Sequence, residues 1–234
     1  MAHSLLLLLK GPLQSWGDES RYTTRATGAT PSKSGVIGLL AAAQGRQRVD
    51  PIEDLVQLDF AVRVDQSGVL LKDYQTAQPW QKAPNANARL VTRYFLTDAA
   101  FVVAIGSTDR KMLEGIQESL KKPAYPLFMG RRSCPVPANL DLGIVDLPVV
   151  DALKAHETWH ATEAHQKERA KRVDLPIYRD GRPGEPGDPR QDVPISFAQE
   201  HRKYGWRNVV YGGSKTVENE NGTAIDPFFE AVIS

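Results

Sequence analysis

Cysteine is nearly missing from this sequence, because Cys134 is the only one among 234 residues. One cysteine cannot form a disulfide within the chain or build a cysteine-based zinc site, so disulfide-stapled folds and zinc fingers are excluded. With 41% hydrophobic residues, the chain is long enough to bury a core without covalent staples. The composition therefore favours a protein of the reducing cytoplasm.

Long apolar runs at the start of the chain are also missing. The run at residues 5–9 has five leucines, and no Lys or Arg precedes it. A secretory signal needs a basic start and about 7–15 apolar residues, and a transmembrane helix needs about 20. We therefore expect neither a signal peptide nor a membrane span, and we interpret residues 4–10 as a buried strand.

Net charge is small, at +1, but the charged residues are unevenly distributed. Residues 1–48 carry six Lys or Arg against two Asp or Glu, and residues 110–132 also carry six against two. Residues 218–234 carry four acids and no Lys or Arg. Two basic segments in a balanced chain indicate a local site for a polyanion rather than a generally basic surface.

The stretch 125–135 places two adjacent guanidinium groups on a short turn. Gly130 can adopt positive φ and Pro135 ends any helix, so the residues between them should form an exposed loop. Guanidinium forks match phosphate oxygens, and the free amides of such a turn add further donors. We interpret the loop as an anion site formed by Arg131, Arg132 and Ser133; a surface loop with solvated arginines is the alternative.

A second anion site is expected where a helix begins near residue 33. Ser32 or Ser34 can cap this helix, and Lys33 lies beside the free amides of its first turn. The glycine spacing of a Walker loop is missing, so binding of nucleoside triphosphates by that motif is excluded. The long loop before the helix is expected to be functional, although Trp16 within it is better interpreted as a core anchor than as a stacking platform.

Apolar patterning predicts an α+β fold. Strands and helices alternate as strand, helix, strand, strand, helix, strand up to residue 147, which is the split βαβ order of ferredoxin-like and RRM domains. Within this domain, 1–147, residues 74–92 are predicted to project as a hairpin inserted into the fold. Residues 148–234 are predicted to form a smaller unit, with a helix-prone start, an irregular excursion at 180–189 and short strands at 193–197 and 207–211.

The segment His156-Glu157-Thr158-Trp159-His160 matches the H-E-x-x-H signature of helical zinc sites. On a helix, both imidazoles would lie on one face. The flanking residues are polar where a catalytic helix should be buried, and His165 does not fit the extended motif. We therefore expect a solvated helix here, and neither a metal nor another cofactor.

Four short segments, in this order along the first 150 residues, resemble the CRISPR-associated CasD family of type I-E Cascade: Gly11–Gly17, Thr30–Leu40, Asp73–Thr76 and Gly130–Pro135. Each segment alone is a weak match, but the four segments together are specific for the family. The last third of the chain resembles the family less clearly, because its His-rich segment and its Pro/Gly excursion depart from the family's pattern.

The resemblance implies a non-catalytic subunit of the antiviral Cascade complex, a cytoplasmic ribonucleoprotein, that holds the 5′ handle of the CRISPR RNA (crRNA). It implies contacts with the backbone subunit CasC and the large subunit CasA, and with target DNA only through the assembled complex. Hairpin 74–92 would act as a thumb against the guide, with Arg93 at its base. The residues expected to bind RNA are Gln14, Trp16, Arg21, Arg25, Lys33, Ser34, Tyr74, Arg89, Arg93, Arg131, Arg132 and Ser133.

A metal-independent endoribonuclease that processes CRISPR repeat RNA is the alternative function, because related subunits of another Cascade subtype cut repeats without metal. Such cleavage needs a general base and a general acid beside a 2′-hydroxyl. His3 is the only histidine in the first 150 residues, so a histidine-based site is not expected there. Tyr22, Lys33 and Tyr74 are the groups that leave this alternative open.

Overall fold

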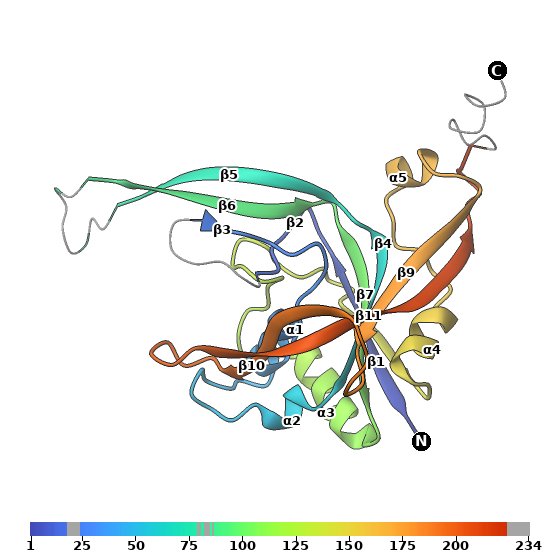
Figure 1. The fold of residues 1–234 in the computed structure, drawn as a ribbon, viewed down its shortest axis with the longest axis horizontal. Helices are drawn as coiled ribbons and strands as arrows, with labels where there is room; N and C mark the ends of the chain where they lie inside the picture. The colour runs from blue at the N-terminus through green and yellow to red at the C-terminus, as the bar shows by residue number, and fades with distance from the viewer. Residues whose placement is uncertain (18–23, 79–80, 82–84, 86, 224–234) are drawn as a thin grey trace.

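The computed structural model is a mixed α/β fold built mainly on antiparallel sheets (Figure 1). It describes residues 1–17, 24–78, 81, 85 and 87–223. The larger sheet contains, from edge to edge, β10 (Asp188–Ser196), β11 (Lys203–Glu218), β9 (Arg172–Asp180), β4 (Asp59–Gln66), β7 (Ala100–Ser107), β1 (His3–Lys10) and β8 (Asp141–Val145). In the smaller sheet, the partners of β6 (Arg89–Thr97) are β2 (Leu13–Gln14), β3 (Thr24–Arg25) and β5 (Val69–Ala77).

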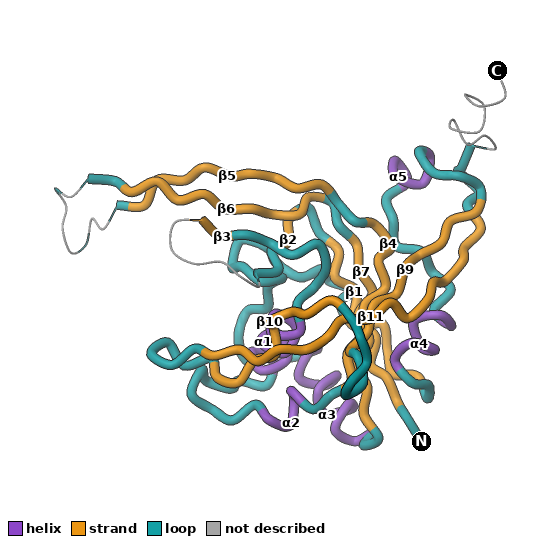
Figure 2. The backbone as a smooth tube through the Cα atoms, viewed as in Figure 1, coloured by secondary structure: helices purple, strands orange, loops and turns teal. Residues whose placement is uncertain are grey.

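Helices cover both faces of the larger sheet (Figure 2). The helices of the described residues are α1 (Lys33–Ala43), α2 (Glu53–Val56), α3 (Arg110–Lys121), α4 (Val149–Ala155) and α5 (Glu163–Lys167), of which α5 buries no residue. Side chains of α1 and α3 pack on one face, whereas α4 packs on the other. None of the helices in the described part of the chain is long and apolar enough to cross a membrane.

The leucine run at residues 5–9 is the central strand β1, which pairs with β7 on one side and β8 on the other. Successive side chains of a strand point to opposite faces. Leu5, Leu7 and Leu9 therefore join the core beneath α1 and α3, and Leu6 and Leu8 join the core beneath α4. The prediction of a buried strand is confirmed.

The two long helices each begin at a capping side chain, and for α1 this cap was expected. The Ser32 hydroxyl accepts a 3.2 Å hydrogen bond from the Gly35 amide and caps α1. The Asp109 carboxylate accepts from the amides of Lys111 and Met112 and caps α3. Each side chain satisfies amides that have no partner within the helix, which fixes where the helix starts.

Strand β4 alternates apolar and polar residues, a pattern typical of a half-buried strand, but nearly all of it is buried. Its polar residues Arg63 and Asp65 form an ion pair of 2.7 Å. Residues 153–160 cover this pair, and no part of the Arg63 side chain is exposed. Alternation of apolar and polar residues indicates two different faces, but it does not show that a later segment covers the polar one.

Residues 156–162 are not helical, so the predicted helix across H-E-x-x-H is wrong. Helix α4 ends at Ala155, and the buried Arg63 guanidinium donates to the carbonyls of Leu153, His156 and Thr158. The amide of His160 donates to the Asp65 carboxylate. Because the buried ion pair binds these backbone groups, the chain continues in an extended form.

Two arms extend from the same side of the larger sheet (Figure 1). One is the hairpin β5–β6, which stays in register from Val69 opposite Thr97 to Ala77 opposite Arg89. It carries the predicted thumb, part of whose tip lies outside the described residues. The other arm contains β10 and the first half of β11.

Strand β11 is much longer than the predicted 207–211. Its ladder with β9 shifts register between Tyr211 and Ser214, where Gly213 has a φ of +94°, and then continues to Glu218. A bulge of this kind bends a strand without ending it. Strand β9 also pairs with β4, so the sheet runs across the predicted boundary at residue 148. The division into two units stays a prediction.

Candidate nucleic-acid interface

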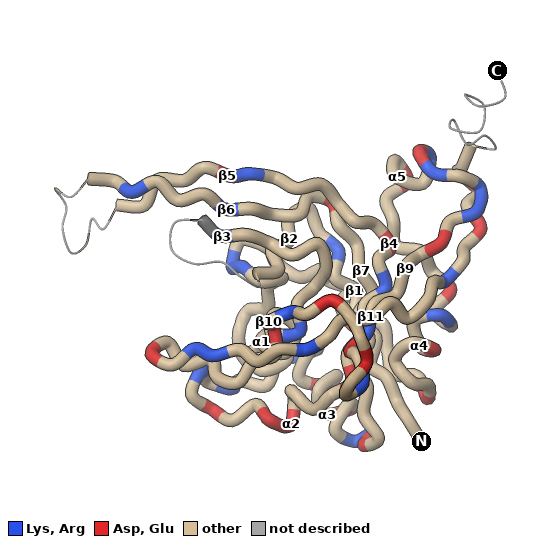
Figure 3. Tube along the Cα trace, viewed as in Figure 1, with Lys and Arg blue, Asp and Glu red and all other residues tan. Residues whose placement is uncertain are grey.

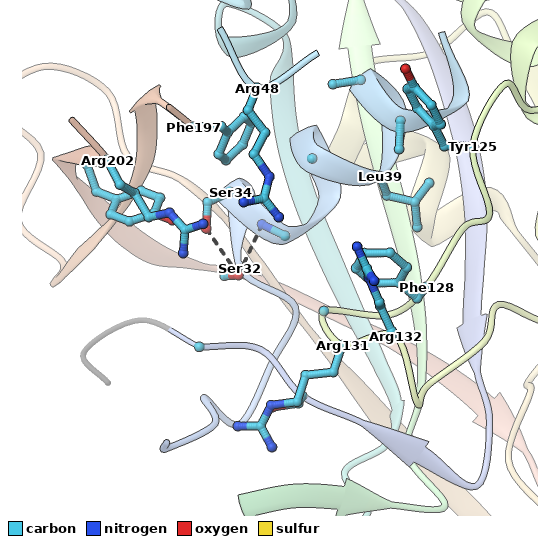
Figure 4. A pocket seen from close by; sticks show the side chains of 18 of the residues that line it. Ser32, Ser34, Leu39, Arg48, Tyr125, Phe128, Arg131, Arg132, Phe197 and Arg202 are labelled. Atoms are coloured by element: carbon cyan, nitrogen blue, oxygen red, sulfur yellow. Dashed lines mark hydrogen bonds between the residues drawn. The ribbon is translucent and has the colours of Figure 1, made fainter. Parts of the chain in front are cut away.

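A groove of about 740 Å³ opens beside α1. The described residues that line it come from six segments, at 15–17, 25–26, 32–42, 46–48, 125–132 and 191–204 (Figure 4). Among these residues the charged ones are six arginines, with no Asp or Glu: Arg25, Arg46, Arg48, Arg131, Arg132 and Arg202. The aromatic ones are Tyr125, Phe128, Phe197 and Tyr204.

Most of this positive charge has no counter-charge among the described residues. Arg46 donates at 2.6 Å to the Asp54 carboxylate, whereas the other five arginines make no ion pair with a described residue. Lys and Arg also occur elsewhere along the trace, but there they alternate with Asp and Glu (Figure 3). A concave surface lined by uncompensated charge of one sign concentrates ligands of the opposite sign.

The loop at 125–135 forms one wall of the groove. As predicted, Gly130 adopts positive φ, at +82°, and a Cβ atom there would lie 1.7 Å from the Ser15 carbonyl oxygen. Phe128 and Pro135 form an isolated bridge, and the Met129 amide donates to the Cys134 carbonyl at 2.7 Å. Only glycine allows the loop to approach the segment after β2 this closely.

The two arginines of this loop have different environments, although the sequence predicted one exposed pair. Arg131 is half-buried, donates to the carbonyls of Tyr94 and Arg25 at 3.1 Å each, and lies 4.6 Å over the Phe95 ring. Arg132 is exposed and has no hydrogen bond or ion pair within the described residues. Arg131 therefore anchors the loop as well as adding charge, and Arg132 is free to bind a ligand.

Three arginines lie near one another where β3 pairs with β6. Arg25 and Arg93 are directly opposite each other in the parallel ladder, and Arg131 donates to the Arg25 carbonyl. Burial, and then the positive charges of Arg93 and Arg25, lower the pKa of Arg131. The buried Nε of Arg93 has no hydrogen-bond partner within the described residues. Opposed like charges destabilise a sheet, and an anion between them would relieve that cost.

The predicted anion site at the start of α1 is filled by the protein's own carboxylates. The Asp192 carboxylate accepts from the Lys33 amide at 2.8 Å, and the Asp180 carboxylate accepts from the Lys33 ammonium at 2.7 Å. Arg207 donates to both carboxylates and lies 5.1 Å over the Phe60 ring. Lys33 is therefore bonded within the protein, and its contact with RNA stays a prediction that the structure does not favour.

Gln14 and Trp16 are also structural. The Gln14 amide donates to the carbonyls of Leu9 and Ala99, and its oxygen accepts from the Trp16 indole at 3.0 Å. Trp16 is only 1% exposed, which agrees with its interpretation as a core anchor and contradicts a role in contacting RNA. The Trp16 ring packs beneath α1 against Gly35 and closes the core there.

The remaining predicted residues lie in three places. Arg25, Ser34, Arg131 and Arg132 line the groove. Tyr74 and Arg89 are exposed on the hairpin β5–β6, and Ser133 is exposed beside the groove without lining it. Arg21 lies outside the described residues.

Sequence reasoning missed Arg48, Phe128, Phe197, Arg202 and Tyr204 as lining residues. Arg48 belongs to the basic segment 1–48, which was the available signal for it. Phe197 and Arg202 come from the connection between β10 and β11, and Tyr204 comes from the start of β11, more than 150 residues after α1 in the sequence. No local pattern indicates that this connection folds back over the helix.

The histidines of the H-E-x-x-H segment interact with each other. The Nε2 atoms of His156 and His160 lie 2.9 Å apart, and the ring planes differ by 11°. One ring must donate its N–H and the other accept it. Burial lowers the pKa of His160 to about 4, which favours neutral imidazoles. The described residues contain no group of three or more His, Cys, Asp or Glu arranged for a metal.

Comparison with known proteins gives consistent matches. The family model of the CRISPR-associated protein Cas5 (Cas5d) matches residues 4–210. The CRISPR system Cascade subunit CasD of Escherichia coli (strain K12) is 36% identical in an alignment of 162 positions that covers 61% of this chain and 71% of that protein.

Two solved structures have a similar fold. A chain described as a CRISPR RNA-guided surveillance complex is 28% identical, with a TM-score of 0.74 and coverage of 97% of this chain and 96% of that one. A second, described as the crystal structure of a Cas protein, is 32% identical, with a TM-score of 0.63 and coverage of 96% and 100%. The likeness therefore extends over almost the whole chain, including the strands after residue 148.

Proposed function

The chain belongs to the CRISPR-associated Cas5 family, and from this premise we propose that it is the non-catalytic subunit of a type I-E Cascade complex that holds the 5′ handle of crRNA. The handle would lie in the groove beside α1. The relatives named above are a Cascade subunit and a chain of an RNA-guided complex, and this supports membership in the same kind of assembly.

The observation that carries the proposal is the composition of the groove. Five of its six arginines lack a carboxylate partner among the described residues, and four aromatic side chains share the same walls. Single-stranded RNA is bound by cationic grooves whose aromatic rings stack on exposed bases. A groove for a neutral or cationic ligand would not have this lining.

The fold offers a rationale for the same role. We assign a ferredoxin-like, RRM-like unit to the strand order β8-β1-β7-β4 with α1 and α3, in which the chain runs β1, α1, β4, β7, α3, β8. Hairpin β5–β6 is inserted between β4 and β7 and would serve as the thumb, with Arg93 at its base. Strands β9 to β11 would then be the smaller C-terminal unit.

Partners follow from the family. In the assembled particle the chain would contact the backbone subunit CasC and the large subunit CasA, and it would meet target DNA only through the guide. Recognition of foreign DNA would come from base pairing with the guide, as in other RNA-guided systems. Such a complex would act in the cytoplasm.

The alternative endoribonuclease is weakened by the groups it would need. The Lys33 ammonium donates to Asp180 and to the Leu58 carbonyl, so it is not available as a general acid or base. Tyr74 is exposed on the arm, and Tyr22 lies outside the described residues. General acid–base catalysis needs two groups positioned around one reacting hydroxyl.

Coexpression with the neighbouring genes and a CRISPR array tests the proposal. RNA of one defined length should copurify through an affinity tag on this chain, and Arg132→Ala should lower its occupancy as the salt concentration rises. Arg172→Ala changes an exposed arginine outside the groove and is the matched control. Particles that hold no RNA, or cutting of repeat RNA by the isolated chain in EDTA, would overturn the proposal.

A further inference from the structure

We propose that the outer edge of strand β5 pairs with the same edge of a second copy of this chain, which makes the free protein a symmetric dimer. The two β5 strands would run antiparallel and join the two β5–β6 hairpins into one continuous ribbon. The pairing rests on the backbone and side chains of β5 and does not require RNA.

Strand β5 is a sheet edge without cover. Its nine residues pair with β6 on one side, and its other side pairs with no strand of the described residues. In Figure 1 it forms the outer border of its arm, on the side away from β2 and β3. All of its residues except Asp73 are exposed. An edge of this kind presents a row of backbone amides and carbonyls to which another strand can add.

The two edges of the larger sheet are protected. β10 contains Pro189 and Pro194, which have no amide to donate, and its ladder with β11 is irregular at two places. β8 has only five residues, and Gly143 within it has a φ of +99°. β5 has neither proline nor glycine and keeps one register with β6 along its whole length. Among the long sheet edges that the structure describes, β5 is therefore the one left open to another chain.

The edge is also apolar for an exposed strand. Val69, Leu70, Leu71 and Tyr74 are between 42% and 71% exposed. They lie on both faces of β5, because neighbouring side chains of a strand alternate. A second strand alongside would shield part of each, and a chain with a net charge of only +1 repels its own copy weakly.

The charges of β5 select one register. In a symmetric antiparallel pair, one residue lies opposite its own copy, and the residues on either side of it lie opposite each other. A pair centred on Lys72 or Asp73 would oppose two like charges, which is unfavourable. A pair centred on Tyr74 opposes two aromatic rings and places Asp73 opposite Gln75. The Gln75 amide already donates to the Asp73 carboxylate within one strand, so these two groups can also bond across strands.

Pairing would stop at two chains. Each chain has one open β5 edge, and the symmetric contact uses both of them, so it closes instead of growing into a fibre. The same hairpin is the thumb of the proposed function, and the dimer would keep it from a guide until a particle assembles. Only this consequence rests on the proposed function, so the pairing is tested on the isolated chain without RNA.

Charge changes at Gln75 test the pairing, and the same changes at Gln57, an exposed glutamine after α2, are the matched controls. Sedimentation equilibrium measures the dimer dissociation constant. Gln75→Glu should weaken dimerisation about tenfold, because a carboxylate would face Asp73 twice in the symmetric pair. Gln75→Lys should strengthen it about threefold, because an ammonium would face Asp73 instead. Both Gln57 variants should keep the parent constant.

Cysteine crosslinking checks the register, and the native Cys134 is buried and does not interfere. Tyr74→Cys should give a disulfide-linked dimer under mild oxidation, because this position lies opposite its own copy. Leu70→Cys should not, since its two copies would lie about 27 Å apart at about 3.4 Å per residue. A parent chain that stays monomeric at every concentration, equal effects of the two Gln75 changes, or crosslinking at Leu70 as strong as at Tyr74 would overturn the proposal.

Discussion

The carboxylate of Asp192 accepts a 2.8 Å hydrogen bond from the backbone amide of Lys33, a residue 159 positions earlier in the chain. Through this contact the C-terminal arm supplies the negative charge at the positive end of α1. It also brings Phe197, Arg202 and Tyr204 to the groove. The last third of the chain, whose role the sequence left unassigned, is therefore part of the site.

Asp192→Asn should lower the free energy of unfolding by about 3 kcal/mol, because it leaves the buried Arg207 with only the more exposed Asp180 as counter-charge and removes the charge at the start of α1. Asp188→Asn on the same strand removes an exposed pair with Arg190 and should cost less than about 1 kcal/mol. Urea denaturation of both variants measures the difference. Equal costs would show that the buried pairs do not fix the arm.

Gly130→Ala should destabilise the protein far more than Gly184→Ala. Both glycines have φ near +80°, but a Cβ atom at Gly184 meets nothing, whereas at Gly130 it meets the Ser15 carbonyl. We expect a loss of about 1–2 kcal/mol for Gly184→Ala from backbone conformation alone. For Gly130→Ala we expect about 2–5 kcal/mol in total, because overlap adds to that cost. Thermal unfolding compares the two, and similar midpoints would contradict the close packing of the loop.

Arg132→Ala should weaken RNA binding without changing stability, because its guanidinium has no partner in the described part of the chain. The slope of log affinity against log salt should fall by about 0.7, the value for one phosphate contact on a single strand. Arg131→Ala should lower the slope and the unfolding midpoint together, since Arg131 also holds the Tyr94 and Arg25 carbonyls. Titrations at several salt concentrations measure the slopes, and an unchanged slope for both variants would contradict phosphate binding by this loop.

His160 should make the stability depend on pH. Burial lowers its pKa to about 4 from an ordinary value near 6.5, so between these values the unfolded chain binds more protons than the folded one. Its contribution is fully present above pH 6.5 and is lost as the pH falls toward 4. His160→Gln should flatten the denaturation profile in this window relative to the parent chain.

The exposed His201 provides the control for this measurement, and His201→Gln should keep the parent profile. If His160→Gln also kept the parent profile, the buried and neutral state of His160 would be wrong.

Local signals predicted much of the fold. The leucine run and the Ser32 cap each act within a few residues, and the strand and the helix that they predicted are present. The turn at Gly130 was also predictable, because positive φ is a local property of the chain.

Long-range pairing determined what was missed. The sequence predicts that Lys33 is a cation beside the free amides of a helix start. Only the fold shows that Asp180 pairs with its ammonium and that Asp192 accepts from its amide. Arg63 redirects residues 156–160 by binding their carbonyls from a strand some 90 positions away. Such contacts leave no periodic pattern, so helix propensity and the H-E-x-x-H spacing pointed to a helix that the buried ion pair prevents.

The most direct test of the account is photo-crosslinking in the assembled particle. Guide RNA with 4-thiouridine in its 5′ handle would be incorporated, irradiated and digested, and the crosslinked peptides would be identified by mass spectrometry. The account predicts crosslinks to the groove segments 125–132 and 191–204, and their loss when the thiouridines are moved to the 3′ end. Crosslinks from the handle to α4 or β8, on elements that do not line the groove, with none in these two segments, would contradict it.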